Sequence, residues 1–237
     1  MAPPRRSSPV ARPGLAGGLF AAVALAAAAP LAAQSGGSWD GLVETKSPRG
    51  DAVFLLPGVD FREYTKVLLE PTEIAFRRNW QRDYNRSVGL GRRMSDEEAA
   101  EIAAAARAGF GEIFADAFRE AGYEVVTAPG PDVLRLRTAV VDLYIAAPEQ
   151  LSAGRTRSYS AEAGEATLIL EARDSSTNAL LGRAVDQDMA GDLPDRRTQA
   201  SNRADFERLF RGWAKLSARG LNDLKARSPV NAPARTR

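Results

Sequence analysis

The chain has 237 residues, with 32 lysines and arginines against 30 aspartates and glutamates, which is long enough for one well-buried core. It contains no histidine and no cysteine. This composition excludes disulfides, imidazole-based zinc sites, lipid attachment to a cysteine, and catalytic sites of the Ser-His-Asp or Cys-His kind.

Residues 1–33 are typical of a secretory signal peptide. The positive end carries three arginines and no acid, and an apolar stretch runs from Leu15 to Ala29. Cleavage is expected after Ala33, with Ser35 as the alternative position. An uncleaved membrane anchor is the competing interpretation, because residues 15–33 approach the roughly 20 residues that a spanning helix needs. We favour cleavage because alanine, which contributes little transfer energy, dominates the segment.

Removal of this leader changes the charge and sets the expected compartment. The remaining chain has 29 basic and 30 acidic residues, so it lacks the long-range positive field that gathers nucleic acids. We expect a periplasmic protein that is not lipidated and has no membrane span after cleavage. Residues 34–51 are expected to be a flexible leader, 52–227 a single domain and 228–237 a disordered tail.

The first half of the domain is expected to hold one strand, one loop and one helix. The run from Lys66 to Phe76 predicts a strand with an irregular middle, because Pro71 lies within it. Residues 77–94 are expected to form a long loop. Ser95 and Glu98 have the spacing of a capping box, which predicts a helix from Ser95 to the stop signal at Gly122.

The second half is expected to hold more strands and a last helix. Strands are predicted over residues 123–127 and 133–145, and the clearest hairpin joins 162–173 to 179–189. The last helix is expected to begin after Asn202 and to end at Ser228-Pro229. Together these elements predict an α+β fold, with a single mostly antiparallel sheet of about five strands and two long helices packed on one face.

The predicted loop over residues 77–93 is the best candidate for contact with a ligand or partner. Guanidinium groups beside aromatic rings suit anionic or ring-shaped partners. The candidate contact residues are Arg78, Trp80, Arg82, Tyr84, Arg92 and Arg93. The alternative, which we favour, is that the two aromatic residues cover the edge of the core while the arginines stay solvated.

Other motifs are weaker. The segment Gly89–Arg93 precedes a helix but lacks the Gly-Lys-Ser/Thr of a phosphate-binding loop. Four aspartates resemble a calcium ladder, but alternate outward positions on a strand give the same pattern; they are Asp186, Asp188, Asp192 and Asp195. The carboxylate pairs Glu70/Glu73 and Glu162/Glu165 have no neighbours that would separate their pKa values. We therefore expect no metal, no cofactor and no identified catalytic residue.

The chain as a whole resembles the DUF3313 family of bacterial envelope proteins, over roughly Asp51 to Lys225. The residues that carry the resemblance are Leu56-Pro57-Gly58, Tyr64, Pro71, Asn79-Trp80, Gly122-Tyr123, Pro129-Gly130, Asp132-Val133-Leu134 and Asp142. The resemblance implies an envelope location and no particular activity, since family members are mostly lipoproteins of unknown function. This chain differs because it lacks the cysteine that accepts the lipid.

These observations favour a non-enzymatic binding or interaction module of the cell envelope. Its expected partner is another envelope protein or an anionic envelope component. Two alternatives stay open. One is a hydrolase of an envelope polymer that uses Asp/Glu acid–base chemistry. The other is a structural assembly protein that pairs through an exposed sheet edge.

Overall fold

The computed structural model describes residues 40–46, 51–146, 158–160, 164–190, 195–197 and 199–230, which belong to one unit spanning residues 37–237. The expected signal peptide lies outside these residues. The strands are β1 (Val43–Glu44), β2 (Ala52–Leu55), β3 (Lys66–Leu69), β4 (Glu73–Phe76), β5 (Glu124–Val126), β6 (Val133–Ile145), β7 (Ser158–Ser160), β8 (Gly164–Asp174), β9 (Leu180–Ala190) and β10 (Asp195–Arg197). The helices are α1 (Trp80–Ser87), the 3-10 turn η1 (Leu90–Arg92), α2 (Asp96–Glu120) and α3 (Gln199–Arg227).

The main sheet is mixed and, within the described residues, has eight strands in the order β1-β2-β9-β8-β6-β3-β5, with β4 also paired to β6. The α+β class is confirmed, but the sheet has more strands than the expected five or so, and it differs in detail from a mostly antiparallel one because three of its pairings are parallel. Pro71 splits the predicted strand into β3 and β4, and both run parallel to β6. Parallel neighbours need a crossover connection, and α2 provides it between β4 and β6.

The split at Pro71 is held by side chains from neighbouring elements. The Thr72 and Thr138 hydroxyl oxygens lie 2.7 Å apart in a hydrogen bond that is buried between β4 and β6. The Arg107 Nε of α2 donates to the Thr72 carbonyl at 3.0 Å. The hydroxyl and the carbonyl of the buried Thr72 therefore both have partners, which is what burial of polar groups requires.

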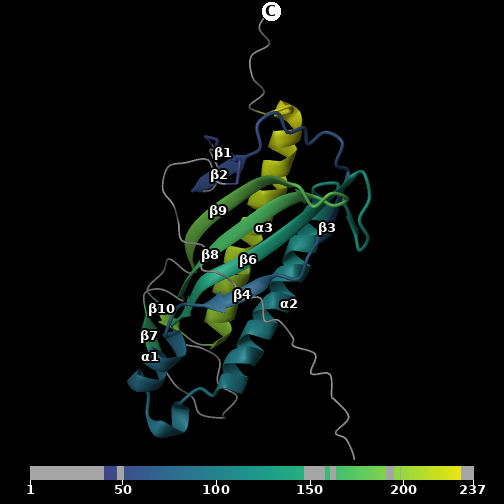
Figure 1. Cartoon of the computed structure of the whole chain (residues 1–237). Coiled ribbons are helices and arrows are strands. Elements are labelled where there is room, and N and C mark those ends of the chain that lie inside the picture. The colour runs from purple at the N-terminus through teal and green to yellow at the C-terminus, as the bar shows by residue number, and fades with distance from the viewer. Residues whose placement is uncertain are drawn as a thin grey trace, which may run out of the picture. The chain divides into compact units, whose positions relative to one another are not determined.

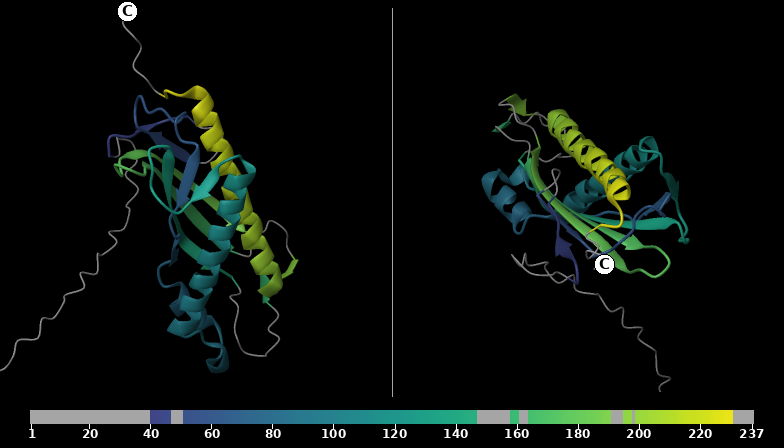
Figure 2. Two further views of the ribbon diagram at one scale, coloured as in Figure 1. Left: turned by 90° about the vertical axis from the view of Figure 1, so that its right-hand side faces the viewer. Right: turned by 90° about the horizontal axis from the view of Figure 1, so that it is seen from above.

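Two helices, α2 and α3, pack side by side on one face of the curved sheet (Figure 2, right), as expected. Figure 1 shows α3 crossing behind β8 and β9. The core fills the space between helices and sheet. Its most completely buried side chains are Leu42, Phe61, Val67, Phe110, Phe114, Phe118, Leu134, Val140, Leu143 and Trp213. Among the described residues no helix combines the length and apolar character needed to cross a membrane.

The N-terminus of α2 confirms the predicted capping box. The Glu98 backbone N–H donates to the Ser95 hydroxyl at 3.1 Å, and the Ser95 backbone N–H donates to the Glu98 carboxylate at 2.8 Å. The helix ends at Glu120 with Ala121 as its C-cap, and Gly122 follows with φ +92°, a conformation that glycine adopts without strain.

Loss of this cap should be measurable. We expect Ser95→Ala to lower the free energy of unfolding by about 1 kcal/mol, because the Glu98 backbone N–H loses the hydroxyl that accepts its hydrogen bond. Urea denaturation measures the change. Ser87→Ala is the matched control. Ser87 is the last residue of α1, and its hydroxyl donates to the Tyr84 carbonyl, so it caps no helix N-terminus. An equal loss in both variants would contradict the capping role.

Three local expectations need correction. Residues 77–94 are not a loop, since α1 and η1 occupy most of the segment. Part of the expected flexible leader is ordered, because Leu42 is fully buried and β1 pairs with β2. The start of the expected tail is also ordered, since the Val230 backbone exchanges hydrogen bonds with Gly58 and Val59. In both terminal segments a buried apolar side chain fixes the backbone.

The sheet face that points away from α2 and α3 carries a cluster of charged residues. Glu171 of β8 accepts hydrogen bonds from Arg183 Nη2 at 2.6 Å and from Arg173 Nε at 2.9 Å. Arg183 is 6% exposed and also contacts Asp40 at 3.3 Å. Burial by itself raises the pKa of Glu171, but hydrogen bonds from the two arginines, and their charge, leave that pKa below its usual value.

Candidate functional site

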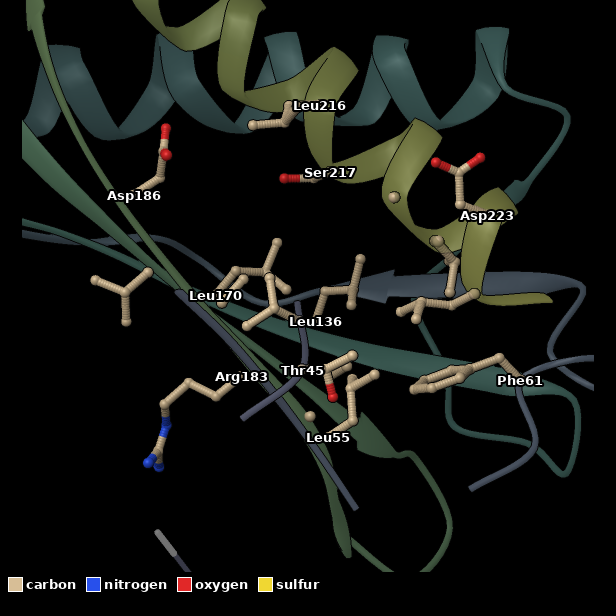
Figure 3. Close-up of a pocket in the computed structure, with 18 of the residues that line it drawn as sticks. Thr45, Leu55, Phe61, Leu136, Leu170, Arg183, Asp186, Leu216, Ser217 and Asp223 are labelled. Carbon is tan, nitrogen blue, oxygen red and sulfur yellow. The ribbon is translucent and has the colours of Figure 1, made fainter. Parts of the chain in front are cut away.

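An apolar cavity of about 120 Å³ lies between α3 and the sheet. Its floor is formed by side chains that β2, β6, β8 and β9 turn toward the helix. They include Val53, Leu55, Leu136, Leu168 and Leu170. Figure 3 shows Leu136, Leu170 and Leu55 gathered beneath the helix. The strand register explains the gathering, since Leu168 and Leu170 are two residues apart and share a face.

The roof of the cavity comes from the C-terminal half of α3. Leu216, Leu221 and Leu224 supply apolar surface, and Ser217 supplies one hydroxyl. The roof is incomplete at Gly220, where a Cβ added to the helix would meet no atom of a neighbouring element within 4 Å. A helix interior normally disfavours glycine by about 1 kcal/mol relative to alanine. At Gly220 the missing side chain leaves space that belongs to the cavity.

One end of the cavity carries a fixed carboxylate, that of Asp186 on β9. Its Oδ2 accepts a hydrogen bond of 2.7 Å from Trp213 Nε1 of α3, and its Oδ1 accepts one of 3.2 Å from the Asp51 backbone N–H. Burial and the charges of Asp51 and Asp188 raise the pKa of Asp186, although the Trp213 bond opposes the shift. Asp186 is thus a half-buried acid held in one orientation from both layers.

The other end carries groups of both signs: Lys46 and Arg227 are exposed, and Asp223 is half-buried. The Arg227 Nε donates to the Asp223 backbone carbonyl at 3.2 Å, so this guanidinium is engaged by its own helix. Arg183 also contributes to the lining, but its guanidinium points away from the cavity (Figure 3) and binds Glu171 on the opposite face.

The predicted contact residues of segment 77–93 are divided by the structure. Trp80 is buried, stacks on Phe76 with ring centroids 4.2 Å apart, and donates from Nε1 to the Ile145 carbonyl at 3.0 Å. Tyr84 packs beside Trp80. Both rings belong to a small second core around Met94 and Ala99, which agrees with the alternative interpretation that we favoured for them.

The four arginines of that candidate set are exposed on and around α1 and η1. They are Arg78, Arg82, Arg92 and Arg93. The Arg82 Nε lies 3.5 Å from Asp83. A role in contacting a partner stays a prediction, and Trp80→Ala cannot test it because that substitution removes a core side chain.

The calcium-ladder pattern has a different explanation from the one expected. Asp186 does not point outward. The register of β9 turns it toward α3, where it meets Trp213. Asp192 lies outside the described residues, as does the side chain of Asp195. Within the described part of the chain, no group of three acidic side chains could hold a metal ion.

The expected carboxylate pair Glu70/Glu73 lies on the outer face of the sheet. Arg137 contacts both acids, Glu70 at 3.0 Å and Glu73 at 3.6 Å, and Arg135 contacts Glu70 at 3.2 Å. Of the second pair, Glu162 lies outside the described residues and Glu165 is paired with Arg77.

A cavity of this kind suits a small apolar group. Apolar cavities of about 150 Å³ in protein cores stay dry and bind ligands the size of benzene. Ligand pockets are mostly apolar, with a few fixed polar groups that orient the ligand. The cavity beneath α3 has both features, and no local sequence signal marks it because its walls come from strands and helices that are distant in the chain.

The fold and the cavity define the class of protein: a two-layer α+β domain in which two helices cover one face of a mixed sheet and enclose an apolar cavity. The chain belongs to the DUF3313 family, described as proteins of unknown function, whose match covers residues 32–217. The family membership expected from the sequence is therefore confirmed. No curated protein matches the chain.

Several solved structures are similar to this one at low sequence identity. PelC from Paraburkholderia phytofirmans, crystallised as a dodecamer, has a TM-score of 0.34 and 13% identity, and the match covers 69% of this chain and 96% of that one. A protein from Xanthomonas campestris has a TM-score of 0.35 and 12% identity, covering 70% and 90%. A homolog of neuraminyllactose-binding hemagglutinin from Helicobacter pylori has a TM-score of 0.36 and 11% identity, covering 72% and 89%. Similarity at this level carries no conclusion about what this chain binds.

Proposed function

We propose that this protein is a binding module of the bacterial cell envelope that takes an aliphatic group into the cavity beneath α3. The observation that carries the proposal is the cavity itself, which is lined by leucine and valine and bounded by one fixed carboxylate. Two features of the sequence support a location in the cell envelope. They are the N-terminal segment typical of a signal peptide and the resemblance of the chain to a family of envelope proteins. The absence of histidine and cysteine limits the chemistry and favours binding over catalysis.

Burial of apolar surface drives such binding. Each methylene group moved from water into an apolar site contributes about 0.8 kcal/mol. A short chain that places two or three methylene groups among Leu136, Leu170 and Leu55 therefore gains a measurable affinity. The ligand would lie along α3, because the cavity extends from Asp186 at one end to Asp223 at the other (Figure 3).

Filling the cavity from the helix side tests the proposal. In Gly220→Leu the new side chain enters the space under α3, where no described atom lies within 4 Å of the added Cβ. We expect the affinity for 1-hexanol, followed by NMR chemical-shift changes, to fall by about tenfold or more. The free energy of unfolding should rise by about 1 kcal/mol, because leucine is a better helix former than glycine.

Gly212→Leu is the matched control. Gly212 lies on the exposed side of the same helix, and an added Cβ there also has no described atom within 4 Å. It should gain helix stability and keep the affinity for 1-hexanol. Unchanged affinity in Gly220→Leu, or no detectable binding of 1-hexanol to the wild type, would contradict the proposed function.

A further inference from the structure

We propose that the aliphatic group which enters this cavity carries a primary ammonium, and that Asp186 binds it. The inference rests on the proposed function and specifies its ligand class. It concerns the Asp186 end of the cavity and the charge of the ligand that this end favours.

Asp186 is held in place by hydrogen bonds from two elements. The Trp213 indole holds it from the helix layer at 2.7 Å, and the Asp51 backbone N–H holds it from the sheet edge at 3.2 Å. A carboxylate has about four acceptor positions, so two hydrogen bonds leave capacity for a donor from a ligand. A binding site gains specificity from such fixed polar groups.

The surroundings of Asp186 select for a positive charge. Asp51 and Asp188 are the charged groups that raise its pKa, and Asp51 is itself fixed to the Gln187 backbone N–H at 2.9 Å. No arginine or lysine among the described residues makes an ion pair with Asp186. An ammonium placed beside it would relieve the repulsion among the acids and form a charge-assisted hydrogen bond.

An anionic head group is disfavoured at the Asp186 end of the cavity. At the opposite end the positive groups that line the cavity are on flexible, exposed side chains. Lys46 and Arg227 are exposed on long side chains, where ion pairs contribute little because water and side-chain entropy oppose them. Arg227 is also engaged by the Asp223 carbonyl. The charge pattern therefore favours an amine over a fatty-acid carboxylate of the same length.

Three probes of equal chain length separate this inference from the proposed function. Hexylamine, 1-hexanol and hexanoate are titrated into the purified protein at neutral pH, and binding is followed by NMR. We expect hexylamine to bind about tenfold or more tightly than 1-hexanol, and hexanoate to bind more weakly than either. Failure of all three to bind would overturn the proposed function. Binding of 1-hexanol with no preference for hexylamine would overturn only the role of Asp186.

Two variants locate the preference. Asp186→Asn should remove the advantage of hexylamine and leave the affinity for 1-hexanol within about twofold, because the apolar walls are unchanged. Asp223→Asn, at the opposite end of the cavity, is the matched control and should retain the full preference. If Asp223→Asn loses the preference instead, or if hexanoate binds best and Lys46→Gln abolishes that binding, the assignment of the head group to Asp186 is wrong.

Discussion

Replacement of Trp213 by alanine should lower the free energy of unfolding by about 3–5 kcal/mol, the range found when a large aromatic side chain is removed from a packed core. Trp213 is 2% exposed and stacks with Phe210, their ring centroids 6.1 Å apart. It is also the donor that connects α3 to Asp186 on β9. Urea denaturation followed by circular dichroism measures the loss.

Trp213→Phe separates the two contributions of this side chain. Phenylalanine keeps most of the apolar contact but has no N–H, so Asp186 retains only the Asp51 donor. We expect a loss of about 1.5–3 kcal/mol, the net contribution of a hydrogen bond to a charged group. A loss in Trp213→Phe as large as that in Trp213→Ala would show that packing contributes little. No loss in Trp213→Phe would show that the hydrogen bond is immaterial.

The second large effect on stability is expected from the charged cluster around Glu171, on the sheet face that points away from α2 and α3. Glu171→Gln should lower the free energy of unfolding by about 3 kcal/mol at neutral pH, the lower part of the range for breaking a buried ion pair. The neutral amide removes the carboxylate that lies 2.6 Å from Arg183, which is 6% exposed, and it also deprives Arg173 of its carboxylate. Thermal and urea unfolding both report the change.

The pH dependence of stability checks the same contact. The pKa of Glu171 is lower in the folded chain than its usual value, so its ionised form stabilises the fold above the unfolded-state pKa. That stabilisation is lost as the pH falls through the lowered folded-state pKa. The difference in stability between wild type and Glu171→Gln should therefore shrink in acid. Glu73→Gln is the control, because Glu73 is 69% exposed, and it should change stability by less than about 0.5 kcal/mol.

Much of the layout could be predicted from local sequence signals. The capping box at Ser95, the stop at Gly122 and the turn between β8 and β9 are chemical patterns within a few residues, and the structure has all three. The helix faces could be predicted because apolar residues recur every three or four positions. The predicted start of α3 after Asn202 is wrong, since the helix begins at Gln199.

Local sequence signals do not predict the strand pairing or the cavity. The parallel pairing of β3 and β4 with β6 depends on α2 packing over the sheet, and the order strand, helix, strand should have suggested it. Asp186 and Trp213 stand 27 residues apart, and nothing local marks an aspartate on a strand as the partner of an indole on a helix. Trp80 looked like a contact residue because its burial depends on Phe76 and Ile145 of other elements.

The pairing of β2 with β9 has a consequence for the order of folding. Asp51, which leads into β2, and Asp186 are 135 residues apart, and contacts of such separation form late because the intervening chain must first be ordered. Leu55 and Val53 reach the ligand cavity only after this closure. A chain that has not yet closed this pairing therefore has no complete cavity, and the proposed binding would report the fully folded domain.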